Sequence, residues 1–148
     1  MPIPALNSDG LLPTGIHDCS LSEVRARFGI FQGSDVRQRL FTRLEELAAV
    51  MTRSGLFETL LLDGSFITTK PAPNDIDLVA GLRPGHNFER DLPMSEYSLV
   101  SRILLRRRFA FDIIVAERES QLYRTYVEFF SRVRGNPEAR KGLLRLTL

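Results

Sequence analysis

The sequence predicts an α/β or α+β domain, built on a mixed sheet of about four strands flanked by helices. Three observations predict this class: a length of 148 residues, alternating helix and strand patterns, and a composition of 43% hydrophobic and 26% charged residues. Such a length suits one domain with a real core, and the two fractions are close to the average for globular proteins. We therefore expect one domain over residues 1–148, with a lead-in over 1–33 and a core over 34–148.

The N-terminal segment is predicted to be irregular and then helical. Residues 1–18 are rich in Pro, Gly, Asn and Asp, which are typical of turns and loops. Ser20 and Glu23 have the spacing of a capping box, in which each side chain binds the other residue's backbone N–H. A short helix should therefore follow Ser20, run through Phe28 and end at Gly29.

One long helix is predicted between Ser34, a candidate N-cap, and Gly55, a natural C-terminal stop. Five apolar residues between them recur at helical spacing, namely Val36, Leu40, Leu44, Leu47 and Met51. Charged residues, among them Arg37, are expected elsewhere on the helical wheel. This distribution is typical of a helix that buries one face.

Two strands and a rigid loop should follow this helix. The apolar run over 57–62 is typical of a buried strand, and Asp63 behind it is interpreted as a turn residue. Residues 70–74 contain two prolines, which fix the backbone and exclude a helix. Acidic and apolar side chains alternate over 75–80, which predicts a second strand followed by a loop over 81–93.

The C-terminal third should continue as helix, strand, helix and strand. These elements are predicted over residues 95–107, 109–115, 118–134 and 142–148. Leu99 and Ile103 are expected to face inward from the first helix, and Gly135 should end the second. The second helix carries an aromatic group, Tyr123, Tyr126, Phe129 and Phe130, whose spacing is more typical of a core than of a surface that stacks bases.

The net charge of +2 conceals an uneven distribution. Residues 1–99 carry 9 basic and 13 acidic side chains, whereas residues 100–148 carry 11 basic and 5 acidic ones. Eighteen of the 20 basic residues are arginine, whose planar guanidinium matches phosphate. The three arginines at 106–108 fit either a helix-dipole role or contact with a triphosphate or RNA, and both interpretations stay open.

Composition excludes several classes of protein. Cys19 is the one cysteine, so the chain holds no internal disulfide and no cysteine-based zinc site. No apolar run approaches the roughly 20 residues that span a bilayer, and the first residues lack the basic and apolar regions of a signal peptide. We therefore expect a cytoplasmic protein with no membrane contact.

Three aspartates within apolar strand patterns are the candidate catalytic residues and metal ligands. Asp75 and Asp77 are two residues apart, so on a strand both point to the same face. Asp112 lies between Phe111 and Ile113 in a later predicted strand. Like charges raise each other's pKa, so converging carboxylates require a cation, and oxygen ligands favour Mg²⁺ or Mn²⁺. An aspartate at a strand start, such as Asp75, also commonly binds only local backbone.

Gly64 and Ser65, directly after the first predicted strand, form a candidate phosphate site. A glycine there lets the backbone approach a ligand, and the serine hydroxyl with neighbouring N–H groups can bind an anion. Lys70 in the proline-rich loop fits either a phosphate contact or plain solvation. An anion site beside a carboxylate-bound metal is the arrangement that phosphoryl and nucleotidyl transfer use.

The order of these motifs resembles that of the DNA polymerase beta-type nucleotidyltransferase superfamily. Its signature of a Gly-Ser turn, paired aspartates and a later strand aspartate is matched by Gly64-Ser65, Asp75-Ile76-Asp77 and Asp112. More narrowly, the chain is similar to small bacterial nucleotidyltransferase-like proteins. That likeness rests on residues 12–18 (LPTGIHD), 63–66 (DGSF) and 141–144 (KGLL).

The resemblance implies a nucleotidyltransferase-type fold and transfer of NMP from an NTP, with ATP as the expected nucleotide. Asp75 and Asp77 would hold one or two Mg²⁺ ions. Asp112 would complete the second metal site and help to deprotonate the attacking hydroxyl. Gly64 and Ser65 would bind the β- and γ-phosphates.

The resemblance is to minimal members of the superfamily, which lack a second helical domain. Such members often act with a partner, including HEPN-type ribonuclease toxins that they can adenylylate. The acceptor would be a hydroxyl of a protein or an RNA, within a toxin–antitoxin or defence pair. The alternative is a catalytically inactive antitoxin or regulatory subunit that binds a nucleotide or a partner protein. A plain nucleic-acid-binding domain is supported only by the positive charge of residues 100–148.

Overall fold

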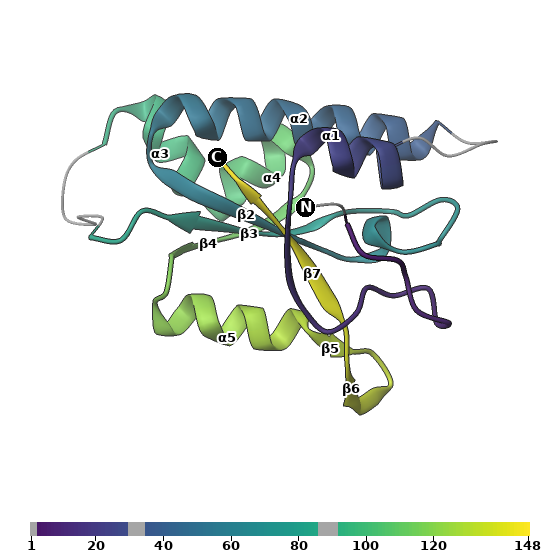
Figure 1. Cartoon of the computed structure of the whole chain (residues 1–148). Helices are drawn as coiled ribbons and strands as arrows, with labels where there is room; N and C mark the ends of the chain where they lie inside the picture. The colour runs from purple at the N-terminus through teal and green to yellow at the C-terminus, as the bar shows by residue number, and fades with distance from the viewer. Residues whose placement is uncertain (1–2, 30–34, 86–91) are drawn as a thin grey trace.

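A five-stranded mixed sheet forms the centre of the molecule (Figure 1). The computed structural model describes residues 3–29, 35–85 and 92–148 of the chain. In spatial order the strands are β1 (Gly15–Cys19), β7 (Gly142–Thr147), β2 (Phe57–Asp63), β3 (Asp77–Leu82) and β4 (Asp112–Glu117). β1 is parallel to β7 and β3 to β4, whereas β2 is antiparallel to both of its neighbours. The predicted α+β class with a mixed sheet is confirmed.

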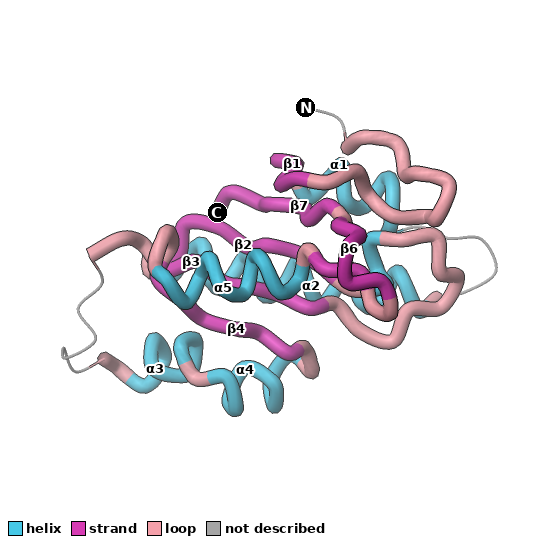
Figure 2. Tube along the Cα trace, turned by 90° about the horizontal axis from the view of Figure 1, so that it is seen from below, coloured by secondary structure: helices cyan, strands magenta, loops and turns pink. Residues whose placement is uncertain are grey.

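Helices cover the two faces of this sheet unequally (Figures 1 and 2). One face carries α1 (Leu21–Val24), α2 (Val36–Ser54), α3 (Met94–Val100) and α4 (Arg102–Phe109). The other face carries α5 (Gln121–Phe130) and a small hairpin of β5 (Arg132–Val133) and β6 (Asn136–Arg140). A π-helix over Arg25–Gly29 continues α1, and a 3₁₀ turn over Ser65–Ile67 follows β2.

Strand residues alternate between two hydrophobic clusters on the two faces of the sheet. Leu60 and Leu62 of β2 pack into the large cluster beneath α2, whereas Leu61 packs into a smaller cluster against α5. Val79 and Ile114 on the neighbouring strands join Leu61. Because side chains alternate along a strand and both faces are covered, the middle of β2 holds three consecutive leucines, Leu60 to Leu62.

The predicted capping box and the predicted end of the long helix are confirmed, whereas the first helix ends at Val24 and a π-helix that includes Gly29 follows it. The Ser20 hydroxyl accepts a hydrogen bond from the Glu23 N–H, and the Glu23 carboxylate accepts one from the Ser20 N–H. Gly55 ends α2 with a φ of 70°, a left-handed conformation that costs glycine little. Ser34 lies outside the described residues, and Asp35 occupies the N-cap of α2.

β1 lies within the segment that was expected to be irregular, so that expectation is wrong for residues 15–18. The side chains of β1 are mostly exposed, and it joins the sheet by pairing with β7, from Gly15 opposite Gly142 to Cys19 opposite Leu146. An edge strand that is held by backbone hydrogen bonds needs no alternation of apolar residues. The sequence pattern therefore carried no signal for this fifth strand.

The predicted helix over 95–107 is two helices. Ser101 separates them because its backbone is extended (φ −95°, ψ 115°) and its side chain caps α4. Leu99 is buried as expected, but Ile103 is 68% exposed. Leu105 takes the inward position instead, because the interruption at Ser101 changes the direction that each later residue faces.

Three further boundaries differ from the prediction. The strand predicted over 109–115 begins at Asp112, because α4 continues through Phe109 and Ala110 is left-handed (φ 59°). α5 ends at Phe130, and Gly135 lies at the turn of the β5–β6 hairpin. The strand predicted over 75–80 is β3, which begins two residues later. Residues 86–91 of the predicted loop lie outside the described ranges.

No helix within the described residues is both long and apolar enough to cross a membrane.

Candidate active site

Three carboxylates stand in one row across β2, β3 and β4, which we call the carboxylate row: Asp63, Asp77 and Asp112. Asp77 is directly opposite Asp63 on one side and Asp112 on the other. Adjacent strands lie about 4.8 Å apart, and directly paired residues point to the same face. The residues two positions away on each strand pack against α5, so the row lies on the α5 face. The structure thus brings together Asp77 and Asp112 of the predicted set, and adds Asp63.

Asp63 is a strand residue and not the turn residue that the sequence predicts. It ends β2 with 5% of its surface exposed, and Lys141 Nζ lies 2.8 Å from its Oδ1. Burial raises the pKa of Asp63, and the Lys141 ammonium opposes that rise. The sequence signal that could have found it is its position between an apolar strand and the Gly-Ser turn.

Asp77, at the centre of the row, has three carboxylates near it, and the charge of Lys141 only partly offsets them. Burial raises the pKa of Asp77, and the charges of Asp63, Asp75 and Asp112 raise it further. Asp75 precedes β3, and its Oδ1 accepts a hydrogen bond of 2.8 Å from the Ile76 N–H. Burial raises the pKa of Asp75 as well, against the effect of that hydrogen bond. In the described part of the chain, neither Asp75 nor Asp77 forms an ion pair.

Asp112 is engaged by an arginine from α4. Arg102 donates to both carboxylate oxygens, with Nε to Oδ1 and a terminal nitrogen to Oδ2, each at 2.8 Å. This two-pronged pair holds the pKa of Asp112 below its usual range. The side chains are 57% and 35% exposed, so the pair contributes about 0–1 kcal/mol. A ligand that needs Asp112 can therefore compete with Arg102.

A glycine is required at position 64 because the chain that follows β2 passes close to Asp77. Its backbone (φ 94°, ψ −175°) occupies a region that is essentially restricted to glycine. A Cβ at this position would lie 3.2 Å from Asp77 Oδ2 and 3.3 Å from Asp77 N. Ser65 follows at the start of the 3₁₀ turn. The predicted phosphate turn therefore lies directly against the carboxylate row.

Arg37 holds the segment that carries this turn, and the sequence interpretation missed it. Its side chain is fully buried and donates hydrogen bonds to the carbonyls of Phe66 (2.5 Å), Thr68 (2.8 Å) and Lys70 (2.5 Å). Burial lowers the pKa of Arg37. The prediction that Arg37 lies off the buried face of its helix is wrong. Its spacing of three residues before Leu40 could have placed it on the buried stripe.

A cavity of about 690 Å³ opens beside the carboxylate row. Its lining includes four of the six predicted site residues, Gly64, Ser65, Lys70 and Asp77. Asp63 and Lys141 also line it, whereas Asp75 and Asp112 do not. The opposite wall comes from the end of α5 and from the β5–β6 hairpin. The volume is within the range of small-molecule sites in proteins.

The chemistry of the carboxylates fits a hard divalent cation. Asp75 and Asp77 offer oxygen ligands, and a cation would relieve the repulsion that raises the pKa of Asp77. Within residues 3–29, 35–85 and 92–148, however, no three His, Cys, Asp or Glu side chains are grouped as a metal site. Asp112 could complete a set with Asp75 and Asp77 once Arg102 releases it.

Of the three arginines at 106–108, Arg106 acts on the carboxylates. Burial raises the pKa of Asp75, and the charge of Arg106 opposes that rise. Arg102 lowers the pKa of Asp112, and Arg106 adds to that effect. Arg108 instead lies over the ring of Phe109, 5.0 Å from its centroid. All three are exposed in the last turn of α4, where cations interact favourably with the helix dipole. Arg106 is therefore the member of this run that bears on the site.

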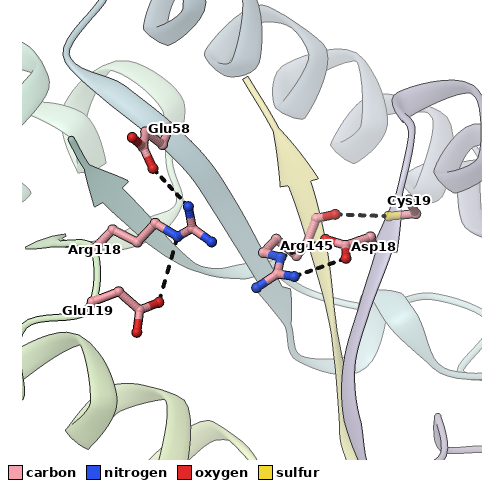
Figure 3. Close-up of polar contacts among 6 residues, drawn as sticks. All are labelled: Asp18, Cys19, Glu58, Arg118, Glu119 and Arg145. Atoms are coloured by element: carbon pink, nitrogen blue, oxygen red, sulfur yellow. Dashed lines mark hydrogen bonds and ion pairs between the residues drawn. The ribbon is translucent and has the colours of Figure 1, made fainter. Parts of the chain in front are cut away.

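A second polar cleft, of about 440 Å³, lies toward the other end of β2. Figure 3 shows its main side chains: Arg118 lies 2.9 Å from Glu58, and Arg145 lies 2.6 Å from Asp18. Each arginine thus has a carboxylate beside it. Burial raises the pKa of the neighbouring Cys19 thiol to about 12, which disfavours the reactive thiolate. The cavity beside the carboxylate row is therefore the better candidate for chemistry.

A comparison with protein families matches residues 4–147. The chain belongs to DUF6932, a family of unknown function. No match was found among curated proteins or among solved structures. Membership in DUF6932 brings no activity with it.

Proposed function

We propose that this protein is a metal-dependent nucleotidyltransferase that transfers NMP from an NTP to a hydroxyl of a protein or an RNA. The observation that carries the proposal is the row of Asp63, Asp77 and Asp112, with Gly64 packed against Asp77. Adjacent like charges favour a bound cation, and the cavity beside them, with Lys70 and other basic side chains, favours an anion. A nucleoside triphosphate with Mg²⁺ or Mn²⁺ meets both requirements.

Each candidate residue has a role that its surroundings support. Asp75 and Asp77 would hold the metal, joined by Asp112 once its arginine partner releases it. Bound Mg²⁺ would neutralise the triphosphate and stabilise the charge on the leaving pyrophosphate. Ser65 and Lys70, which line the cavity, would bind the β- and γ-phosphates. Gly64 lets its turn approach Asp77 closely, and its backbone would bind phosphate, as the resemblance to nucleotidyltransferases implies.

The proposed reaction forms one bond and breaks one. The acceptor hydroxyl oxygen bonds to the α-phosphorus, the bond from that phosphorus to the bridging oxygen breaks, and pyrophosphate leaves. Arg102 holds the pKa of Asp112 low, so this carboxylate is a weaker base than the resemblance implies. The hydroxyl proton therefore passes to solvent in this scheme, and Asp112 serves as a metal ligand.

The same arginine favours a second candidate function. Arg102 occupies both oxygens of Asp112. If that pair stays closed, the chain would bind a nucleotide through Asp75 and Asp77 without a complete catalytic set. It would then be a regulatory subunit or antitoxin, with a HEPN-type ribonuclease toxin as the expected partner.

Nucleotides labelled at different phosphates distinguish these functions. The protein is incubated with Mg²⁺, ATP carrying ³²P at the α- or γ-position, and tRNA or a HEPN-type ribonuclease as acceptor. Label transferred from α-³²P but not from γ-³²P supports NMP transfer, and label transferred from γ-³²P alone would mean a kinase. Nucleotide binding without transfer supports the regulatory function.

Calorimetry tests the site itself. The double variant Asp75→Ala/Asp77→Ala should lose Mg²⁺–ATP binding, because both proposed ligands are gone. The matched control Glu45→Ala/Glu46→Ala removes two exposed acids from α2 and should bind as wild type does. Equal affinity of wild type and the aspartate variant would contradict the proposed site.

A further inference from the structure

Phe129 is an exposed aromatic side chain that borders the candidate cavity. It is 59% exposed, whereas Tyr123 on the same helix is 4% exposed and belongs to the core. The sequence interpretation of one aromatic core group therefore holds for Tyr123 but is wrong for Phe129. An exposed phenylalanine that lines a cavity is available to a ligand.

The ring of Phe129 is the outermost of three aromatic rings that pack together on α5. It packs edge-on against Phe130, with centroids 5.5 Å apart and an interplanar angle of 67°. The ring centroids of Phe130 and Tyr126 are 6.0 Å apart, and both side chains pack against the smaller hydrophobic cluster. This support restricts the motion of Phe129, so a flat ligand would lose little entropy by stacking on it.

The same wall of the cavity is basic. Arg132 and Arg134 of the hairpin line it, and Lys141, which pairs with Asp63, also lines the cavity. Glu128, which is not part of the lining, lies 3.5 Å from Arg132 Nε. With Lys70 the lining holds four cationic side chains, against the two carboxylates Asp63 and Asp77. Its balance is therefore positive, which suits a ligand that joins a flat ring to negative charge.

We propose that Phe129 is the stacking platform for the base of the nucleoside triphosphate, with Arg132 and Arg134 beside its sugar and phosphates. This inference rests on the proposed function, because it assigns the far wall of the cavity to the nucleotide whose phosphates lie at Gly64 and Ser65. Both walls line one cavity of about 690 Å³, a volume within the range of small-molecule sites. Stacking strength follows ring size, so purine nucleotides should bind more tightly than pyrimidine nucleotides.

Calorimetry with two probes tests this role, using Mg²⁺–ATP and Mg²⁺–tripolyphosphate, which lacks the base. Phe129→Ala should weaken ATP binding about tenfold, and leave tripolyphosphate binding unchanged. The matched control is Leu122→Ala, since Leu122 is 51% exposed on the same helix and does not line the cavity. It should leave the binding of both probes unchanged.

A fluorescent variant provides an independent readout. The chain contains no tryptophan, so Phe129→Trp introduces a single one. Its emission should be quenched by ATP and not by tripolyphosphate, and this variant should bind ATP at least as tightly as wild type. Because Trp retains an aromatic face, this readout also decides the matter if Phe129→Ala fails to fold.

The outcomes separate the two proposals. If wild type binds neither probe, the proposed function fails and the stacking role fails with it. If wild type binds both but Phe129→Ala binds ATP equally well, the stacking role alone is overturned. Equal weakening of both probes by Phe129→Ala also overturns it. The role is likewise overturned if Phe129→Ala changes the mass measured by sedimentation but not the ATP affinity. Phe129 would then lie in an interface between copies of the chain.

Discussion

The carboxylate of Asp77 lies between two others, and its ionisation therefore opposes folding as long as no cation is bound. The outer members of the row have partners, Lys141 for Asp63 and Arg102 for Asp112. The site thus combines a repulsive centre with compensated ends. A cation bound at Asp77 would supply the ion-pair partner that Asp63 and Asp112 already have.

The first prediction concerns the pH dependence of stability. The pKa of Asp77 is raised above its ordinary value of 3.8, so this group destabilises the folded state increasingly as pH rises from 3.8 through the raised pKa. Asp77→Asn removes the charge and therefore this destabilisation of the folded state. In magnesium-free buffer the variant should therefore be more stable than wild type at pH 7, and the difference should shrink toward pH 4. Urea denaturation between pH 4 and pH 8 measures it.

Asp18→Asn is the control for this prediction, because its effect should have the opposite sign. Arg145 lowers the pKa of Asp18, so this carboxylate stabilises the folded state above 3.8 and loses that effect as pH falls. Asp18→Asn should then be less stable than wild type at pH 7. An Asp77→Asn variant that is also less stable at pH 7 would show that Asp77 is not repelled by its neighbours.

A second prediction concerns the pair of Arg102 and Asp112. Arg102→Gln should release the carboxylate and tighten Mg²⁺ binding about two- to fivefold, which corresponds to about 0.4–1 kcal/mol for an exposed pair. Calorimetric titration with Mg²⁺ measures the change. Arg107→Gln, an exposed arginine on the same helix, should have no such effect. Weaker Mg²⁺ binding by Arg102→Gln would mean that Asp112 needs Arg102 to be positioned.

At the scale of elements, the connection from β2 to β3 is held in an unusual shape. Gly64 has a backbone conformation that is essentially restricted to glycine, and Arg37 of α2 binds three carbonyls of the following segment. A guanidinium satisfies several acceptors at once, because its donors point in fixed directions. The segment with the candidate phosphate turn is therefore positioned by a buried side chain from a different element.

The third prediction compares two glycines at the ends of elements. Gly64→Ala should cost about 1–3 kcal/mol in stability and weaken Mg²⁺–ATP binding, because its Cβ would crowd Asp77. Gly55→Ala should cost about 1–2 kcal/mol because Gly55 is left-handed, but its Cβ would meet nothing within 4 Å. Its nucleotide affinity should stay unchanged. Equal affinities of the two variants would remove Gly64 from the site.

At the scale of the whole molecule, the first residues complete the sheet. β1 covers the edge of β7, while Ile3 and Leu12 are buried in the main cluster. Arg27 also donates a hydrogen bond of 2.7 Å to the Ile3 carbonyl. The segment that its composition predicts to be irregular therefore contributes both backbone pairing and apolar contacts.

The fourth prediction is that a chain beginning at residue 20 loses most of its stability. Two buried apolar side chains alone account for about 3–6 kcal/mol, out of a total of about 5–15 kcal/mol for a typical domain. The uncovered edge of β7 should also promote association between chains. Thermal unfolding and light scattering measure these effects. An unchanged melting temperature in a monomeric truncated chain would show that these contacts do not stabilise the fold.

How much could be predicted depended on how far apart in the sequence the interacting residues lie. α2, β2 and the Ser20–Glu23 cap were predicted closely, because their signals lie within a few neighbouring residues. The ends of α4 and α5 were not, since Ser101 and the β5–β6 hairpin depend on what surrounds them. Of the site, the motif of Gly64 and Asp77 was visible, but the inclusion of Asp63 required the register of β2 against β3.

The sequence by itself determined the class of fold, the main helix and central strands, and the carboxylates and Gly-Ser turn that suggest a metal and a nucleotide. These follow from local periodicity and residue chemistry. Only the tertiary structure decided that Asp63 stands beside Asp77, that Arg102 engages Asp112, and that Phe129 faces a cavity and not the core. The physical reason is that such neighbours are set by strand register and helix packing, which join residues that local patterns cannot relate.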